Sequence, residues 1–97
     1  MSAVNYALNN YKFPLGSIYF TTNAADTLNN ADAMNALQRH EYGDWGECIL
    51  EDRQSNDDAL LYGDRLFSVY WDRNDVKFWI ITEADRSSTT ILLPEDY

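Results

Sequence analysis

Carboxylates are concentrated in the middle of this chain, between residues 41 and 64, where the only Lys or Arg is Arg53. These carboxylates belong to Glu41, Asp44, Glu47, Glu51, Asp52, Asp57, Asp58 and Asp64. Carboxylate oxygens are the ligands that Ca²⁺ and Mg²⁺ prefer, and a dense group of them also attracts basic surfaces over long distances. Two kinds of site follow from this composition: a site for a hard cation, or a surface for a cationic partner.

The spacing of these carboxylates does not favour a metal site. A calcium-binding loop alternates Asp or Asn ligands around a central Gly and closes with Glu, and residues 44–52 lack that pattern. Asp57 and Asp58 are adjacent, so helix geometry points them in different directions. We therefore predict no metal and no other cofactor, and interpret each carboxylate, taken singly, as part of a solvated helix face.

Cys48 is the single cysteine and His40 the single histidine. A Cys/His pair can supply a nucleophile and a base, but the chemistry also needs an orienting third group and an oxyanion site, which the spacing does not indicate. We interpret Cys48 as a small buried hydrophobic residue at a helix start. We interpret His40 as a polar residue near a helix end, where a positive imidazolium suits the helix dipole. We therefore predict no catalytic residues and a protein that is not an enzyme.

A polar connector over residues 82–88 separates two apolar segments. Asp85 and Arg86 could pair with a partner, or Glu83 and Asp85 could receive a basic one. The alternative, which we favour, is a strand connection in which Asp85 or a nearby serine hydrogen-bonds the turn backbone and Arg86 bridges to a local carboxylate. Trp45 also has two interpretations. We favour a core position, although an exposed Trp commonly anchors an interface.

The whole chain has 16 Asp and Glu against 7 Lys and Arg, a formal charge of -9. Direct binding to nucleic acid is disfavoured, because no basic stripe is present to replace the counterions of the phosphates. The predicted partner is instead the basic surface of a nucleic-acid-binding protein or complex. The start of the chain has no secretory signal pattern, and no apolar run approaches a membrane span, so we expect a cytoplasmic protein that does not enter a membrane.

We predict a single α+β domain over residues 1–97, in which residues 1–12 form a poorly determined lead-in. A short strand is expected over 16–22, followed by a helix over 24–28 with Asn23 as its N-cap. A second helix is expected over 33–40, capped by Asn30 or Asp32; two short helices and one broken helix fit equally well.

In the second half of the chain, the spacing of apolar residues changes from a helical period to the alternation typical of strands. We predict a turn at 44–47 and then a helix that ends at Gly63, which Ser55 and Asn56 interrupt in one interpretation. The expected apolar contacts of this helix are Ile49, Leu50, Ala59, Leu60 and Leu61. Alternation over 65–71, 76–82 and 89–93 then predicts a three-stranded antiparallel meander packed on the helices, with 76–82 as its central strand.

This chain resembles a widespread group of short proteins carried on bacterial plasmids, phages and integrative elements. The resemblance covers roughly residues 36 to 97 and is carried by residues 43–47, 51–54, 56–57, 65–66 and, above all, 79–97. It implies a genomic setting of mobile DNA. It carries over no catalytic residues.

The charge and this setting together predict an acidic inhibitor of a host defence complex, of anti-CRISPR or anti-restriction type. Such a protein would act as a DNA mimic by occupying a basic nucleic-acid-binding surface. The alternative is a non-catalytic accessory or antitoxin-like binding module for a basic protein of the same element. The oligomeric state is left open. The predicted partner-binding residues are Asp44, Glu47, Glu51, Asp52, Asp57, Asp58 and Asp64, with Trp45, Glu83, Asp85 and Arg86 as secondary candidates.

Overall fold

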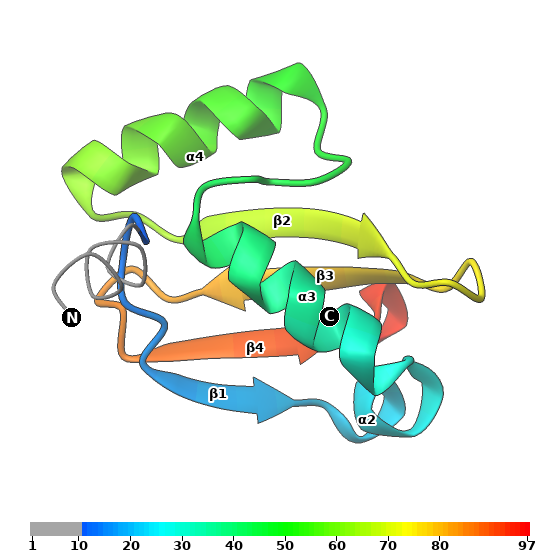
Figure 1. Ribbon diagram of the computed structural model, residues 1–97. Helices are drawn as coiled ribbons and strands as arrows, with labels where there is room; N and C mark the ends of the chain where they lie inside the picture. The colour runs from blue at the N-terminus through cyan, green and yellow to red at the C-terminus, as the bar shows by residue number, and fades with distance from the viewer. Residues whose placement is uncertain (1–10) are drawn as a thin grey trace, which may run out of the picture.

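A computed structural model describes residues 11–97, and the part of the predicted lead-in over residues 1–10 lies outside the described residues. The helices and strands are arranged around one sheet (Figure 1). In chain order they are β1 Ser17–Phe20, α2 Thr22–Thr27, α3 Asn30–Glu41, α4 Leu50–Tyr62, β2 Leu66–Trp71, β3 Lys77–Thr82, β4 Ser88–Leu92 and the 3₁₀ helix η1 Pro94–Asp96.

The sheet has four strands in the order β1-β4-β3-β2. Strands β2, β3 and β4 pair antiparallel, whereas β1 pairs parallel to β4. The α+β class is therefore confirmed, but the predicted three-stranded antiparallel sheet is wrong, because β1 adds a parallel edge strand. A hairpin turn fixes the pairing of neighbouring strands, whereas β1 is joined to its partner only through the rest of the fold.

Helices α2 and α3 begin earlier than the sequence indicates. Thr21 caps α2 by accepting a hydrogen bond from the amide of Ala24, where Asn23 was predicted as the cap. Asn29 caps α3 by accepting from the amide of Asp32, where the predicted caps lay one and three residues later. Ser, Thr, Asn and Asp are all good N-caps, so a sequence with several in a row does not single one out.

The main core lies between one sheet face and helices α2 and α3; in Figure 1, α3 crosses in front of the strands and α2 lies beyond the end of β1. Small residues on the inner side of α3 let the helix lie close to the sheet, and large side chains fill the space from the strands. The core residues are Ala24, Leu28, Ala33, Ala36, Leu37, Tyr70, Phe78, Ile80, Ile91 and Leu93.

Helix α4 lies beyond the edge strand β2 (Figure 1). It is continuous through Ser55 and Asn56, and it ends as predicted at Gly63, which adopts a left-handed conformation with φ of 77°. The prediction of its apolar contacts is largely wrong. Ala59 is buried and Leu60 half-buried, but Ile49, Leu50 and Leu61 are exposed, and the other buried residue of the helix is Asn56.

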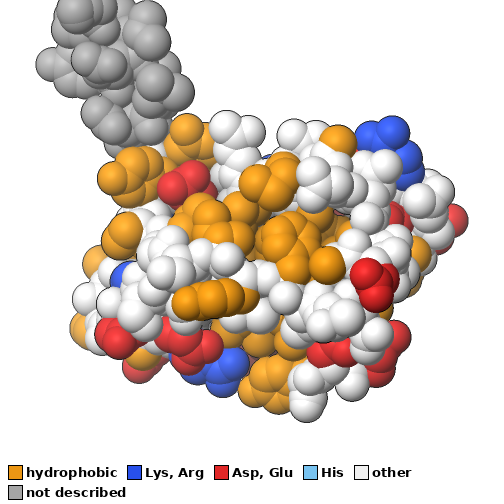
Figure 2. All heavy atoms as spheres, turned by 90° about the horizontal axis from the view of Figure 1, so that it is seen from below, with side chains coloured by type: hydrophobic (Ala, Val, Ile, Leu, Met, Phe, Trp, Pro, Cys, Tyr) orange, Lys and Arg blue, Asp and Glu red, His pale blue; other side chains and the backbone are white. Residues whose placement is uncertain are grey.

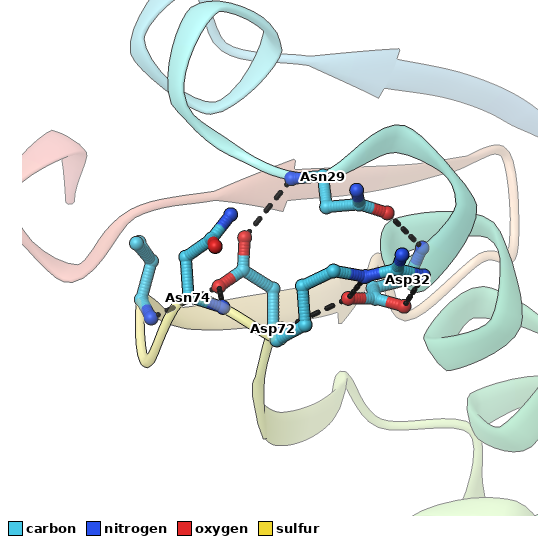
Figure 3. A network of polar contacts seen from close by, with 6 residues as sticks. Asn29, Asp32, Asp72 and Asn74 are labelled. Carbon is cyan, nitrogen blue, oxygen red and sulfur yellow. Dashed lines mark hydrogen bonds and ion pairs between the residues drawn. The ribbon is translucent and has the colours of Figure 1, made fainter.

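The turn between β2 and β3 is tied to the start of α3 by a network of polar contacts (Figure 3). The buried carboxylate of Asp72 accepts hydrogen bonds from the amides of Asn29, Asn74 and Val76 at 2.8–3.0 Å. Burial alone would raise the pKa of Asp72, but these three donors outweigh it and hold that pKa below its usual value. Next to this carboxylate, Arg73 forms a two-pronged ion pair with Asp32.

None of the helices between residues 11 and 97 combines the length and the apolar character needed to cross a bilayer.

Candidate partner-binding surface

The loop that leads into α4 runs along β2 and fixes where the helix begins. The amide of Glu47 donates to the carbonyl of Val69 at 2.7 Å, and the amide of Val69 donates to the carbonyl of Trp45 at 3.2 Å. Gly46 has φ of 69°, and a Cβ atom on it would lie 2.0 Å from the carbonyl oxygen of Val69. Only glycine therefore allows the loop to approach this strand so closely.

Asn56 fixes the middle of α4 to the same strand. Its Nδ2 donates to the carbonyl of Phe67 at 2.6 Å, and its Oδ1 accepts from the amide of Phe67 at 3.0 Å. Sequence reasoning missed this residue as a contact. An Asn in the interior of a helix is unfavourable by itself, and this is the signal that could have pointed to a tertiary role.

Arg86 fixes the carboxyl-terminal end of α4. Its guanidinium donates to the carbonyls of Ala59 at 3.0 Å and Asp64 at 2.6 Å, where it also complements the negative end of the helix dipole. The prediction that Arg86 bridges to a local carboxylate is therefore wrong, because its partners are backbone carbonyls. In the same connector, Asp85 accepts from the amide of Ser87 at 3.0 Å, which confirms the predicted turn contact. Glu83 faces Arg65 across 3.6 Å.

Trp45 lies in the second core, between α4, the sheet and the segment before β1, and only 5% of it is exposed. Its ring stacks on Phe13 with a centroid distance of 6.2 Å, and its Nε1 donates to Asp57 Oδ1 at 3.2 Å. The core interpretation of Trp45 is confirmed, and the side chain is not an exposed anchor.

The seven predicted partner-binding carboxylates differ in how far they are engaged. Asp44 forms a two-pronged contact with Arg39 at 2.7 and 3.2 Å, and this contact holds the pKa of Asp44 below its usual value. The ion pairs within residues 11–97 are Arg39–Asp44, Arg65–Glu83 and Arg73–Asp32. In that part of the chain, the other predicted carboxylates therefore have no ion-pair partner: Glu47, Glu51, Asp52, Asp57, Asp58 and Asp64.

The carboxylates surround the outer part of α4 and do not form one straight ridge. Glu51 and Asp58 are seven residues apart, so they lie on the same side of the helix, and both are exposed. Asp52 is half-buried and, by its spacing of four and seven residues, lies on the same side of the helix as the buried Asn56 and Ala59. Glu47 lies in the loop along β2, because α4 begins only at Leu50, so Glu47 and Glu51 do not lie one turn apart on a helix.

Large apolar side chains share this surface with the carboxylates. Helix α4 and the residue before it expose 63% of Ile49, 69% of Leu50, 78% of Leu61 and 77% of Tyr62. A surface helix normally exposes polar groups, so four large exposed apolar residues at its two ends are unusual. We call the exposed carboxylates and apolar residues of 47–64 the α4 surface.

The predicted position of His40 is confirmed, but the predicted positive charge of its imidazole is wrong. His40 lies in the last turn of α3 as expected, but it is fully buried, with Nδ1 2.5 Å from Ser68 Oγ and Nε2 2.9 Å from Thr82 Oγ1. Burial, together with the positive charge of Arg86, lowers the pKa of His40 to about 3, so the ring is neutral and not an imidazolium.

Cys48 lies just before α4 and is buried, as predicted. Its thiol donates to the carbonyl of Phe67 at 3.3 Å, and burial, with the nearby charge of Asp52, raises its pKa. A thiol of this kind is a poor nucleophile at neutral pH. Within residues 11–97, no three His, Cys, Asp or Glu side chains come together as a metal site would require.

Comparisons with protein-family models, with curated proteins and with solved structures give no match for this chain. The resemblance to proteins of mobile elements therefore stays a prediction.

Proposed function

We propose that this protein is a non-catalytic inhibitor that uses the α4 surface to occupy a basic nucleic-acid-binding surface of a host defence complex, of anti-CRISPR or anti-restriction type. The observation that carries the proposal is the combination on one exposed helix of carboxylates without ion pairs and four large exposed apolar side chains. The resemblance to proteins of mobile DNA supplies the biological setting.

The charges account for the choice of partner. Carboxylates along α4 imitate the negative charge of a nucleic-acid backbone and steer the protein towards a cationic cleft. The same charges repel one another, which opposes folding, and Arg53 is the only Lys or Arg between residues 41 and 64. A partner that neutralises these carboxylates removes the repulsion between them. This relief adds to the binding free energy that the direct contacts supply.

The shape of the surface favours binding as a rigid unit. Helix α4 is held at its start by the loop along β2, in its middle by Asn56 and at its end by Arg86. A surface that is fixed before binding loses less conformational entropy when it binds. The exposed apolar side chains then supply the desolvated contact area that charge alone does not provide.

The exposed apolar residues also favour a second candidate, an accessory or antitoxin-like module that binds a basic protein of the same element. A cleft that normally holds nucleic acid requires charge, whereas Leu61 and Tyr62 fit a partner with an apolar pocket beside its basic residues. The two candidates share the α4 surface and differ in the partner.

The test is an immunity assay in cells that carry an active type I CRISPR, type II CRISPR or restriction system. We expect expression of the protein to restore phage or plasmid entry in at least one of them. The double variant Glu51→Lys, Asp58→Lys should abolish the effect, because both residues are exposed on the same side of α4. The matched control, Asp26→Lys with Glu95→Lys, changes the charge equally at exposed positions away from α4 and should retain it.

Unchanged immunity in every strain of the panel would reject the inhibitor. If both double variants lost the inhibitory effect equally, the effect would depend on the net charge of the protein and not on the α4 surface. The accessory module predicts instead that the protein co-purifies with a basic protein of its own element. In that case Leu61→Ser with Tyr62→Ser should release the partner at low salt, where purely electrostatic binding persists.

A further inference from the structure

The two edge strands of the sheet differ in whether their outward backbone groups are hydrogen-bonded. The outer edge of β2 is closed by the loop before α4 and by the side chain of Asn56, which together engage the backbone of Val69 and Phe67. The opposite edge is β1, which pairs on one side with β4. Open strand edges with unpaired backbone groups are the usual sites at which further strands add to a sheet.

The hydrogen bonds to β4 show which backbone groups of β1 point outward. The amide of Ser17 donates to the carbonyl of Ser87, and the amide of Thr21 donates to the carbonyl of Ile91, each at 3.0 Å. In a parallel pair, alternate residues direct both backbone groups to the same neighbour. Residues 17, 19 and 21 therefore face β4, and Ile18 and Phe20 direct their N–H and C=O groups away from the sheet.

The residues of this edge strand are apolar or uncharged, and one carboxylate lies beside its end: Asp96 accepts hydrogen bonds from Thr21 and Asn23 at 2.6 and 2.7 Å. No residue between Phe13 and Ala25 is charged, and β1 exposes 44% of Ile18 and 56% of Tyr19. Figure 2 views the molecule from the side of β1 and shows hydrophobic side chains gathered in the middle of this face, with Asp and Glu side chains towards its margins. Helix α4, which carries four carboxylates without an ion pair among the described residues, is at the opposite edge of the sheet.

We propose that β1 is a dimerisation strand, which pairs antiparallel with β1 of a second copy of this chain about a two-fold axis at Tyr19. Ile18 of each copy then lies opposite Phe20 of the other, and each of these pairs exchanges both of its N–H···O=C hydrogen bonds. The two sheets join into one that runs through both copies. Tyr19 of each copy faces its counterpart directly across the axis.

Two features of this edge allow a second copy of the chain to pair with it. The outward residues, Ile18 and Phe20, are placed symmetrically about Tyr19, so one two-fold axis satisfies all of them with the same surface on both chains. Two chains of charge -9 repel each other, and this repulsion is weaker where the strand itself carries no charge, because repulsion between more distant carboxylates is screened beyond about 8 Å at physiological ionic strength. The dimer leaves both α4 surfaces free, so it does not depend on the proposed function.

The first test measures the molar mass of the full chain by analytical ultracentrifugation over a wide concentration range. We expect a shift from monomer to dimer mass as the concentration rises, and loss of that shift in Tyr19→Asp, which places two charges on the axis. Tyr62→Asp is the matched control, since it also replaces an exposed tyrosine, on α4, and should dimerise normally. Circular dichroism confirms that both variants are folded. A monomer mass at all concentrations, or equal dimerisation of the two variants, would overturn the proposal.

The second test introduces one cysteine at a time, beside the native Cys48, which is buried, and does not depend on the Tyr19→Asp variant. Tyr19→Cys places two thiols at directly opposed positions of a non-hydrogen-bonded pair, about 4.5 Å apart at Cα and within disulfide range. Ile18→Cys is the control, because its thiol lies opposite Phe20 of the other copy and not opposite itself. Under mild oxidation at dimer-forming concentration, we expect covalent dimers from Tyr19→Cys at least tenfold faster than from Ile18→Cys. Similar rates for the two variants, or no cross-linking, would reject this register.

Discussion

The side chain of Asn56 makes with Phe67 the two hydrogen bonds that a residue of a neighbouring strand would make. Its Nδ2 donates to the carbonyl of Phe67 at 2.6 Å, and the amide of Phe67 donates to its Oδ1 at 3.0 Å. One side chain of α4 thus closes the edge of β2 and fixes the helix along the sheet. The α4 surface depends on this contact for its position.

Asn56→Ala should therefore destabilise the fold. The substitution removes both hydrogen bonds from Asn56 to Phe67, which leaves the Phe67 amide without this acceptor and its carbonyl with the weaker contact of the Cys48 thiol; an unsatisfied group of this kind costs about 1–3 kcal/mol. We expect a decrease of about 2–3 kcal/mol in the free energy of unfolding, measured by urea denaturation. Gln54→Ala is the control, an exposed substitution in the same helix, with an expected change below about 0.5 kcal/mol. Equal effects of the two substitutions would contradict this role of Asn56.

The buried imidazole of His40 predicts a pH dependence of stability. The pKa of His40 is about 3 in the folded chain and about 6.5 when unfolded, so the unfolded state binds the extra proton between these values. The contribution of the neutral His40 ring to the free energy of unfolding is therefore fully present above about pH 6.5. It decreases as the pH falls towards 3, by up to about 1.4 kcal/mol per pH unit. Urea denaturation at pH 7, 6, 5 and 4.5 measures the slope. It should be much smaller in His40→Gln, and a wild-type slope retained in that variant would show that other groups cause it.

Two glycines with similar backbone angles should respond differently to the same substitution. Gly46 and Gly63 have φ of 69° and 77°, but a Cβ on Gly63 meets nothing within 4 Å, whereas on Gly46 it would lie 2.0 Å from a carbonyl oxygen of β2. Gly63→Ala should decrease stability by about 1 kcal/mol, the usual cost of a left-handed conformation. Gly46→Ala should cost about 3 kcal/mol or more, because the loop must also move. Thermal unfolding of both variants provides the comparison, and equal shifts would argue against the close approach.

Arg86→Lys should loosen the end of α4. The backbone angle of residue 86, with φ of 62°, remains the same, but a single ammonium cannot reproduce the forked contacts to the carbonyls of Ala59 and Asp64. We expect a loss of about 1–2 kcal/mol and faster amide hydrogen exchange in the last turn of α4. Arg73→Lys, at an exposed ion pair with Asp32, is the control and should cost less than about 1 kcal/mol. Unchanged exchange in α4 of Arg86→Lys would reject the proposed contact.

The parts of the fold that could be predicted from the sequence are those with local signals. The alternating pattern placed β2, β3 and β4 within one or two residues of their observed ends, because side chains of a strand alternate between its faces. Gly63 could be identified as a helix end because a left-handed residue there favours glycine. The burial of Cys48 and Trp45 also followed from their residue types.

Residues distant in sequence decided the rest. His40 lies near a helix end, but Ser68 and Thr82, 28 and 42 residues further along the chain, make it a buried neutral ring. For α4, we predicted that Ile49, Leu50 and Leu61 face inward, but they are exposed, and Asn56 is buried beside the predicted Ala59. The periodicity of the helix does not predict which side is buried, because the contact that determines the buried side comes from the edge of β2.

By itself, the sequence determined the α+β class, the positions of three strands and the concentration of negative charge over residues 41–64, since composition and alternation are local properties. The tertiary structure alone decided that β1 pairs parallel to β4, that α4 lies outside β2, and which carboxylates remain without an ion pair. Pairing and burial depend on which distant segments meet when the core forms. That outcome is a property of the packed chain as a whole, and a single segment does not encode it.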